Sequence, residues 1–290
     1  MNSLVSIILP NYNHAAFLQD RLDSIFNQSY QNFEVIILDD ASTDHSLELL
    51  NPYKNNPKVS HFIINENNSG SPFKQWEKGL ELIKGDFIWI AESDDFCDLN
   101  FLESQLECLD ASDVAVAKTI AFVKDKSKSE VSHPIFSEEK QKDSILYCPI
   151  LNVSCLLFKT SLLDGTKDNF YSSFKIIGDR VFYFECFRNA AFIFNAKTLN
   201  YFRQSDSSIS KLDYRDLRYY SKYFKEHCQF ISYAKATDKA MTNKAYKRYV
   251  SRFYNRVSNR VSFKQKRSLE YLNLYFLYKL KLSLNLNKKY

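Results

Sequence analysis

The stretch VSIILPNYNHAAFLQDRLDSIFNQSYQNFEVIILDD, residues 5–40, carries the pattern that predicts the architecture of this chain. It begins with the apolar run VSIIL and ends with a second such run, EVIIL. Uninterrupted β-branched runs are typical of strands that are buried on both faces of a sheet. Between the runs, apolar residues repeat at helical spacing. The stretch therefore predicts a strand, a helix and a second strand.

The same alternation continues along the chain. VSHFIINE (59–66) and DFIWIAE (86–92) have strand patterns, and SPFKQWEKGLELIKG (71–85) has a helical pattern with Pro72 near its start and Gly85 at its end. Strand and helix thus alternate from residue 4 to 110. This order predicts an α/β fold with a Rossmann-like, mostly parallel central sheet flanked by helices.

The middle of the chain has a less regular pattern. Residues 115–123 are predicted to form another strand, and 124–143 form a charged excursion. VSCLLFKTSLL (153–163) is predicted to be a strand followed by a helix.

Polar residues gather where each of the first four predicted strands ends. They are Pro10 to Asn13, Asp39 with Asp40, Asn65 to Gly70, and Glu92 to Asp95. Ligands of doubly wound sheets bind at the carboxyl ends of the parallel strands. We therefore expect these four clusters to converge on one site.

The fourth strand runs directly into acids, in the stretch GDFIWIAESDDFCD (85–98). The carboxylates of Glu92, Asp94 and Asp95 would repel one another unless a cation or hydrogen-bond donors hold them ionised. Such oxygen ligands suit Mn²⁺ or Mg²⁺, which take further ligands from phosphates and water. The stretch thus predicts a Mn²⁺ or Mg²⁺ site. The alternative is a solvated acidic loop before the next helix, and Asp98 alone fits that alternative.

The aspartates in ILDDASTD (37–44) are compatible with either a phosphoenzyme or a nucleobase-binding site. Aspartyl-phosphate phosphatases also end a strand in aspartates, but they need a second aspartate at the place where this chain has Ala41. The spacing therefore counts against a phosphoenzyme. A carboxylate fixed at this strand end can instead accept a hydrogen bond from a nucleobase, and Tyr12 at the neighbouring strand end can stack on that base.

Charge is distributed unevenly over the 290 residues. Residues 211–290 contain 20 Lys and Arg against 5 Asp and Glu, whereas the rest of the chain contains 19 against 29. Aromatic residues are interleaved with the basic ones at roughly helical spacing, which predicts a mainly helical tail. Three interpretations remain open: a solvated face, a nucleic-acid surface, or a face that lies on anionic lipid. The membrane is the favoured partner and nucleic acid the least favoured, because RNA-binding signatures are missing.

The cysteines and the first residues indicate the cellular compartment in which the protein is expected. The six cysteines show no paired metal-ligand spacing, so we expect reduced thiols in a cytoplasmic protein. The first apolar run lacks a basic region before it and is stopped by Pro10, so we expect a strand there and no signal peptide. With the basic tail, this pattern is compatible with a peripheral position on the inner face of the plasma membrane.

Four stretches resemble, in their order and spacing, the signatures of family 2 glycosyltransferases of the GT-A fold. They are residues 3–44, KGDFIWIAESDDFCD (84–98), IGDRVFYFECFR (177–188) and YFRQSDSSIS (201–210). The resemblance implies a bacterial-type, inverting enzyme that uses a nucleotide diphosphate sugar. It implies a glycosyltransferase domain over residues 1–210, with a nucleotide-binding half of about 1–110 and an acceptor half of about 111–210. It does not extend to the basic region, 211–290.

The resemblance also implies roles for the residues at the strand ends. Glu92, Asp94 and Asp95 would contact the ribose and the metal that bridges the diphosphate. The family usually has Asp where this chain has Glu92, so Asp94 and Asp95 are the better metal candidates. The residues that would hold the base and ribose are Pro10, Tyr12, Asn13, Asp39 and Asp40.

Later positions complete the site that the resemblance implies. Asp179, in GDR, is similar to the residue that acts as the base, although by its sequence alone it would be an ordinary helix N-cap. Arg203 falls near the diphosphate, and Ser205 replaces a histidine that often follows in the family. Lys74 and Trp76 are further candidates for contact with the donor's sugar or phosphates, against the alternatives of a surface cation and a core indole.

Together, these features predict an enzyme that transfers a sugar to an acceptor hydroxyl. The acceptor would be a saccharide or a lipid-linked saccharide, in cell-surface polysaccharide or glycolipid assembly. Two alternatives are a nucleotide-sugar hydrolase and a module that binds a nucleotide sugar without turnover. Release of the nucleotide diphosphate only when acceptor is added would distinguish the transferase from both.

Overall fold

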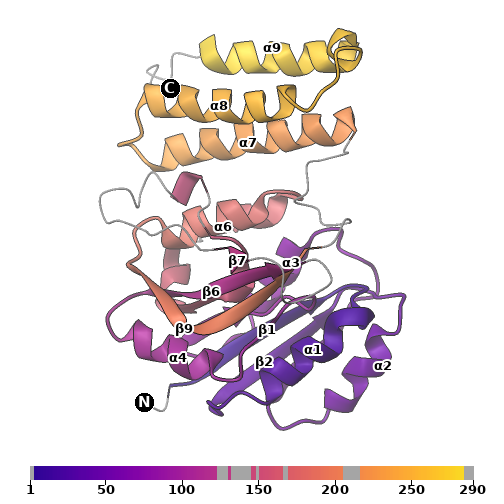
Figure 1. The fold of residues 1–290 in the computed structure, drawn as a ribbon, viewed down its shortest axis with the longest axis vertical. Helices are drawn as coiled ribbons and strands as arrows, with labels where there is room; N and C mark the ends of the chain where they lie inside the picture. Colours follow the sequence, from indigo (N-terminus) through magenta and orange to yellow (C-terminus); the bar gives the residue numbers. More distant parts are fainter. Residues whose placement is uncertain are drawn as a thin grey trace. The chain divides into compact units, whose positions relative to one another are not determined.

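The computed structural model describes residues 3–122, 130–131, 145–147, 150–165, 169–204 and 216–283 (Figure 1). The chain divides into two compact units, an N-terminal unit of residues 1–205 and a C-terminal unit of residues 206–290. The boundary predicted at residue 210 falls in a segment outside the described residues. The two units are described separately below.

The first half of the N-terminal unit is a parallel sheet with the order β3-β2-β1-β4. Its strands are β1 (Val5–Asn11), β2 (Phe33–Asp39), β3 (Val59–Ile64) and β4 (Phe87–Ile90). Every residue of β1 and β2 is buried, as expected for strands that are covered on both faces. The four strands and their parallel pairing confirm the prediction from the sequence.

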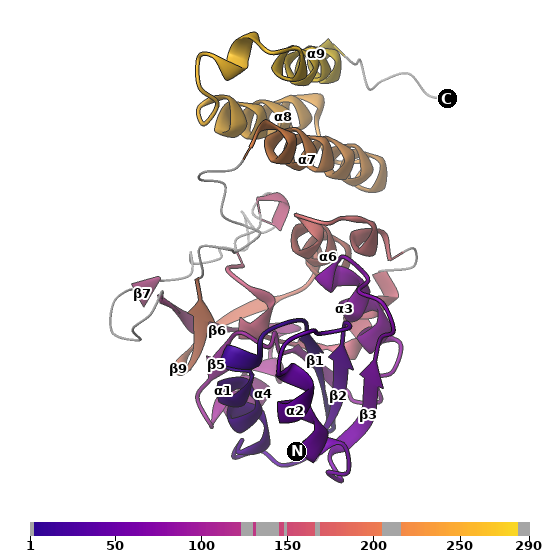
Figure 2. The same cartoon turned by 90° about the vertical axis from the view of Figure 1, so that its right-hand side faces the viewer.

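Helices connect these strands and cover both faces of the sheet. The connecting helices are α1 (Ala15–Phe26), α2 (Ser46–Leu50) and α3 (Pro72–Leu80). Right-handed crossovers place α1 and α2 on one face, because the chain moves outward from β1 to β3. The chain then returns past β1 to β4, so α3 lies on the opposite face (Figures 1 and 2).

The second half of the sheet is mixed. After α4 (Phe101–Leu109), its strands are β6 (Val114–Phe122), β8 (Leu156–Lys159) and β9 (Phe192–Arg203). Strand β8 is inserted between β4 and β6 and is antiparallel to both, whereas β9 runs parallel to β6. Two short strands complete the nine-stranded sheet: β5 (Phe96–Cys97) pairs with β9, and β7 (Glu130–Val131) pairs with β6.

Three short 3-10 helices and α6 (Gly178–Phe187) fill the rest of the described part of this half. The segment after β8, predicted to be a helix, forms the 3-10 helix Thr160–Gly165. The predicted strand at 115–123 is confirmed as β6. The charged excursion at 124–143 lies outside the described residues, except for β7.

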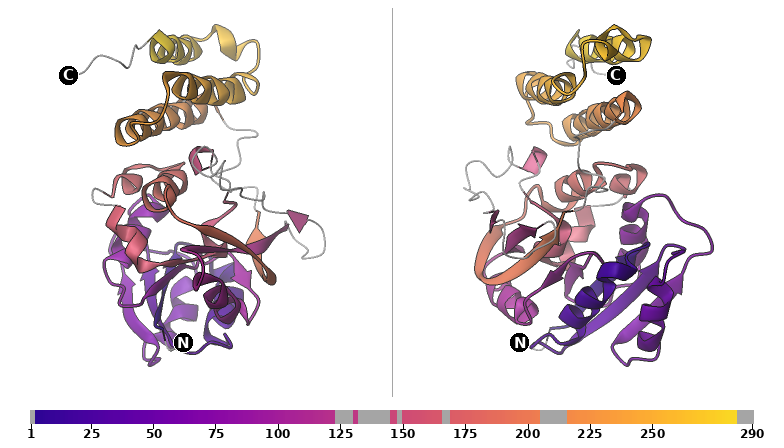
Figure 3. Two further views of the ribbon diagram at one scale, coloured as in Figure 1. Left: turned by 90° about the vertical axis from the view of Figure 1, so that its left-hand side faces the viewer. Right: turned by 45° about the vertical axis from the view of Figure 1, so that its right-hand side comes forward.

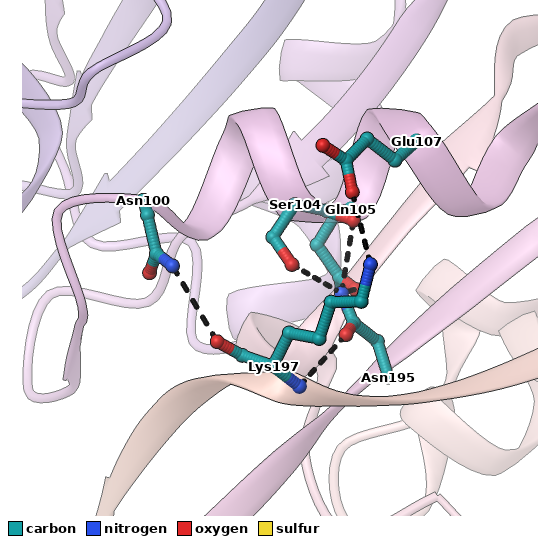
Figure 4. Close-up of polar contacts among 6 residues, drawn as sticks. All are labelled: Asn100, Ser104, Gln105, Glu107, Asn195 and Lys197. Carbon is teal, nitrogen blue, oxygen red and sulfur yellow. Dashed lines mark hydrogen bonds and ion pairs between the residues drawn. The ribbon is translucent and has the colours of Figure 1, made fainter.

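Strand β9 contains an irregularity that α4 stabilises (Figure 4). The register between β9 and β6 shifts after Asn195, which pairs with Ala117, whereas Leu199 pairs with the next residue of β6. The side chain of Asn195 donates to the Ser104 carbonyl at 3.0 Å and to the Gln105 side chain at 3.0 Å. Backbone groups in a bulge lose ladder partners, and the Lys197 backbone N–H instead donates to the Asn195 side-chain oxygen at 2.9 Å. These hydrogen bonds fix the course of β9 toward its end at Arg203.

The described part of the C-terminal unit consists mainly of three helices that pack on one another (Figures 1 and 3). They are α7 (Leu217–Thr237), α8 (Asn243–Ser258) and α9 (Leu269–Ser283). Asp216 and Thr242 accept hydrogen bonds from backbone N–H groups in the first turns of α7 and α8, at 2.8 and 3.1 Å. The His227 ring stacks on Phe253 in the core, with centroids 3.6 Å apart. In the described segments, no helix has both the length and the apolar composition that crossing a membrane requires.

Candidate active site

The carboxyl ends of the parallel strands meet as the sequence predicts. At the ends of β1 and β2, the Asn11 side chain donates to Asp39 at 2.8 Å. At the ends of β2 and β3, the Asn65 side chain donates to Asp40 at 2.7 Å. Neighbouring polar clusters are therefore in direct contact, and the acids that follow β4 belong to the same edge of the sheet.

Three acids follow β4 and form a compact cluster, which we call the acidic triad: Glu92, Asp94 and Asp95. One carboxylate oxygen from each lies within 4.8 Å of the others. Asp95 is fully buried, whereas Glu92 and Asp94 are half-buried. An all-oxygen set of this size matches the preferences of Mg²⁺ and Mn²⁺. The triad therefore has the composition and the size of a site for a divalent cation.

Burial raises the pKa values of all three carboxyl groups, and the charges of neighbouring acids also raise those of Glu92 and Asp95. Burial raises the pKa of Glu92 well above its usual range, and the charges of Asp94 and Asp95 raise it further. Burial and the nearby charge of Asp94 raise the pKa of Asp95 to about 7. Groups that cannot all ionise side by side are stabilised by a bound positive charge. The electrostatics of the triad thus agree with its geometry.

Residues from distant parts of the N-terminal unit hold Asp95 in place. The Asn152 side chain donates to one carboxylate oxygen at 2.6 Å, and the Arg203 backbone N–H donates to the other at 3.0 Å. The Ser154 hydroxyl accepts from the backbone N–H of Glu92 at 3.1 Å. Asn152 and Ser154 lie just before β8, which is antiparallel to β4 and therefore begins where β4 ends. The sequence analysis missed both residues, because no local pattern reveals an antiparallel insertion.

A buried arginine contacts the loop that carries the acidic triad. The Arg21 side chain in α1 is fully buried, and its Nε donates to the Glu92 carbonyl at 2.8 Å. Its guanidinium lies over the Trp89 ring, 5.3 Å from the centroid, and lowers the pKa values of all three carboxyl groups. The sequence analysis did not select Arg21. In the sequence, the position of Arg21 between Leu18 and Leu22, on the apolar face of α1, indicates a buried charge.

Arg203, the last residue of β9, also contacts the loop that carries the acidic triad. Its Nε donates to the Asp94 carbonyl at 3.0 Å, and its guanidinium pairs with Asp20 at 3.1 Å. The guanidinium also lies between the rings of Phe17 and Phe122, at 4.4 and 4.8 Å from their centroids. The structure therefore brings Arg203 to the acidic stretch, and these contacts orient its side chain. Ser205 lies outside the described residues.

Asp39 organises the turn after β2. It is buried and accepts bonds from Asn11 and from both the backbone N–H and the hydroxyl of Ser42, the last at 2.7 Å. Ala41 in this turn has a φ of 61°, a left-handed conformation that is costly for a residue with a Cβ. Asn13 has a φ of 54° and its side chain accepts from the Thr43 backbone at 2.7 Å. The ends of β1 and β2 thus form one rigid support.

Asp40 is also buried, and hydrogen bonds from the chain occupy both of its oxygens. Its Oδ1 accepts from Asn65, Gln75 and the Ser69 backbone, at 2.7 to 2.9 Å. Its Oδ2 accepts from the Ser69 hydroxyl at 2.7 Å and from the Ser69 backbone N–H at 3.1 Å. The carboxylate is held in a fixed orientation by these bonds.

The remaining predicted residues at this edge differ in exposure. Tyr12 follows β1 directly and is 44% exposed, which leaves its ring face available for stacking. Pro10 is buried inside β1. Lys74 is exposed on α3, whereas Trp76 is buried in the core against Phe73 and Phe182. The core position of Trp76 excludes it from contact with a donor.

Asp179 lies in the first turn of α6 and within electrostatic range of the triad, because its charge raises the pKa of Glu92. Its carboxylate accepts a hydrogen bond from the Arg180 backbone at 2.7 Å. The preceding residue, Gly178, packs so closely on Phe73 of α3 that a Cβ would lie 2.3 Å from the ring. The Ser71 hydroxyl donates to the Phe174 carbonyl at 3.0 Å and joins the same two segments. These contacts bring the predicted base to the site although it lies far away in the sequence.

The pKa of Asp95 gives a pH-dependent prediction for the metal-free protein. The value of about 7 lies above the ordinary value of 3.8, so the folded chain binds this proton more tightly than the unfolded chain does. The stabilisation is complete below pH 4 and is lost as the pH rises toward 7. The free energy of unfolding, measured with urea in EDTA, is therefore expected to fall more steeply over this range in the wild type than in Asp95→Asn. If the free energy of unfolding had the same pH dependence in both proteins, this result would contradict a raised pKa of Asp95.

Comparisons with known proteins place the chain among glycosyltransferases. Residues 6–192 match the family model described as glycosyl transferase family 2. An uncharacterized glycosyltransferase of Haemophilus influenzae is 42% identical over 103 residues, 36% of this chain and 41% of the relative. The poly(ribitol-phosphate) beta-N-acetylglucosaminyltransferase TarS of Staphylococcus aureus is 29% identical over 193 residues, 64% of this chain and 32% of the relative. The matches thus cover less than half the length of either relative.

Two solved structures have a similar fold. TarS residues 1–349 in complex with UDP-GlcNAc align with a TM-score of 0.71 and 20% identity, over 96% of this chain and 81% of that chain. A mannosyltransferase of Pyrobaculum calidifontis in complex with GDP-Man and Mn²⁺ aligns with a TM-score of 0.53 and 15% identity, over 96% and 82%. These likenesses confirm the predicted GT-A fold. With the family model matching most of the N-terminal unit, the chain belongs to glycosyl transferase family 2.

Proposed function

We propose that the chain transfers a sugar from a nucleotide diphosphate sugar to an acceptor hydroxyl, with inversion at the anomeric carbon. The observation that carries the proposal is the buried acidic triad at the end of β4, with Asp179 within electrostatic range of it. This arrangement combines a site for a charged diphosphate with a separate carboxylate that can accept a proton. Membership of the family and the UDP-GlcNAc bound by TarS support the choice of donor.

The acidic triad is the proposed cation site. Asp94 and Asp95 would hold Mn²⁺ or Mg²⁺, and Glu92 would stand beside them. The cation would stabilise the charge on the departing diphosphate. Asn152 and the Arg203 backbone keep Asp95 oriented before any ligand arrives, so little reorganisation is needed on binding. Mn²⁺ in the Pyrobaculum structure supports this assignment.

The ends of β1, β2 and β3 are the proposed nucleoside site. Asp40, which directly follows β2, is the proposed acceptor for the ring N–H of uracil, and the exposed ring of Tyr12 suits stacking on the base. Asn13 and Asp39 shape the loop between them, and Pro10 supports it from β1. Lys74 and Arg203 are the proposed basic partners of the diphosphate.

Asp179 is the proposed general base. It would accept the proton of the acceptor hydroxyl as the oxygen attacks the anomeric carbon from the face opposite the diphosphate, in a single displacement. It stands in the first turn of α6, and helix N-termini stabilise negative charge. The close packing of Gly178 on Phe73 limits movement of this turn relative to α3.

We further propose that the acceptor is a saccharide or lipid-linked saccharide of a cell-surface polymer, assembled at the cytoplasmic face of the membrane. The five cysteines in the described segments are free thiols, as expected in the cytoplasm. The basic C-terminal unit is proposed to contact the membrane peripherally.

Acceptor-dependent release of nucleotide diphosphate tests the proposed activity. A panel of nucleotide sugars is first screened for binding by calorimetry in Mn²⁺, and UDP-linked sugars are expected to bind best. Release of the diphosphate is then measured with and without saccharide acceptors, and products are identified by mass spectrometry. Release that needs no acceptor would show a hydrolase instead, and donor binding without turnover across the acceptor panel would show a binding module.

A further inference from the structure

The outer face of α9 is apolar although it does not pack against the other helices. Tyr271 and Leu274 are buried and form the inner face. About half a turn away, four large apolar side chains are exposed on the opposite face: Leu269, Leu272, Phe276 and Leu280. Leu269 is 75% exposed and Phe276 is 71% exposed. Their spacing of three and four residues places all four on one side of the helix.

This face is unlike the surface of an ordinary helix. A helix that packs on one side normally has polar residues on the other. Single exposed apolar residues are common and need no explanation, but four neighbours on one face, with Phe263 also exposed just before the helix, form a continuous apolar strip. Such strips are typical of surfaces that bind a partner or a membrane.

Basic residues surround the apolar strip. Lys264 and Arg267 precede it, and Lys279 lies within α9, and all three are exposed. The Arg267 guanidinium lies over the exposed Phe263 ring, 4.4 Å from its centroid. The single acid between residues 261 and 283 is the half-buried Glu270. The strip therefore has a positively charged border.

A second basic feature lies on the neighbouring helix. Lys244, Arg248, Arg252 and Arg256 are exposed on α8 and follow one another at intervals of four residues. Side chains at this spacing lie on the same helical face, and each pair of like charges costs about 0.2–0.5 kcal/mol. A row of four such charges gives this face of α8 a strongly positive potential. An anionic partner relieves the repulsion.

We propose that the C-terminal unit binds an anionic phospholipid bilayer, with the apolar strip of α9 inserted among the headgroups and with its basic border and the basic row of α8 binding lipid phosphates. Apolar side chains with a basic border match both components of such a surface. A second copy of the chain fits less well, because two units with 20 basic and 6 acidic residues each would repel one another. Nucleic acid would satisfy the charges but not the aliphatic side chains. The apolar strip and its basic border are thus the proposed surface for the peripheral membrane contact, and anionic phospholipid is the proposed lipid class. This binding does not depend on sugar transfer.

Vesicle sedimentation with the full-length chain tests this proposal. Binding is measured to vesicles of phosphatidylcholine alone and to vesicles with phosphatidylglycerol added. Leu272→Ser combined with Phe276→Ser is expected to weaken binding to the anionic vesicles about tenfold or more, because two apolar side chains no longer insert. Arg248→Gln combined with Arg256→Gln is expected to weaken it by about fivefold for each charge removed. The matched control is Leu99→Ser, which removes a 52% exposed side chain from the N-terminal unit and should leave binding unchanged.

Several results would overturn the proposal. Equal binding to neutral and anionic vesicles would show that the protein does not recognise anionic lipid. Unchanged binding in both double variants would show that the strip and the basic row are not the binding surface. Self-association in sedimentation velocity that the Leu272→Ser and Phe276→Ser variant abolishes, without vesicle binding by the wild type, would identify a second copy as the partner. Tighter binding to an RNA oligonucleotide than to anionic vesicles would identify nucleic acid. Donor binding, measured on the same proteins by calorimetry, reports separately on the proposed transferase function.

Discussion

Replacement of Asp179 by Asn is expected to lower turnover by about 10²- to 10⁴-fold, the usual contribution of a general base. The amide keeps the size of the side chain but no longer accepts the proton from the acceptor hydroxyl. Affinity for the donor should scarcely change, because the proposed nucleoside and cation sites lie on β1, β2 and the loop after β4. Turnover and donor binding are measured by diphosphate release and by calorimetry.

Glu103→Gln is the matched control for this experiment. Glu103 stands in the first turn of α4, as Asp179 does in α6, so its replacement removes an equivalent favourable interaction with a helix N-terminus. It should leave turnover near the wild-type value. Near-normal turnover of a folded Asp179→Asn protein would show that another group accepts the proton.

Replacement of Asp95 by Asn is expected to reduce both donor affinity in Mn²⁺ and turnover, each by on the order of a hundredfold or more, since metal-ion catalysis is worth several kcal/mol. The change removes the charge of the most buried member of the acidic triad. Without Mn²⁺, the variant and the wild type should bind the donor equally weakly. Titration of Mn²⁺ itself, by calorimetry without the donor, separates lost metal binding from lost donor contacts.

Asp98→Asn is the control for the Asp95 variant, because Asp98 belongs to the same acidic stretch but lies outside the triad. Its carboxylate accepts from the Leu199 backbone at 2.9 Å and from the Tyr201 hydroxyl at 3.3 Å. It should retain Mn²⁺-dependent donor binding. Equal, metal-independent donor affinity in wild type and Asp95→Asn would contradict the cation site.

The parallel half of the sheet was predictable because local patterns determine it. The buried runs of β1 and β2, the helical spacing between them and the polar residues at their ends are all visible within short windows of sequence. The convergence of Asn11, Asp39, Asp40 and Asn65 then follows from parallel pairing alone. The resemblance to a known family added Asp179, whose own sequence surroundings indicate only a helix start.

The supports of the acidic triad were not predictable in the same way. Asn152 and Ser154 reach Asp95 and Glu92 only because β8 enters the sheet antiparallel to β4, and no local period encodes that order of strands. Arg21 was missed for a different reason: a charged residue on an apolar helix face is usually taken for a surface residue, whereas here the Glu92 carbonyl and the Trp89 ring provide its partners. Both cases depend on tertiary contacts rather than on propensity.

The distance along the chain between Asp95 and its partners also sets an order of events during synthesis. The strands β1 to β4 are complete once residue 90 has been made, so the parallel half can pair early. Asn152 and the Arg203 backbone are translated 57 and 108 residues after Asp95. Until they arrive, a nascent chain exposes the acidic loop without its two hydrogen-bond donors. The acidic triad therefore gains its full set of hydrogen-bond donors only when Arg203 has been made, two residues before the N-terminal unit ends at residue 205.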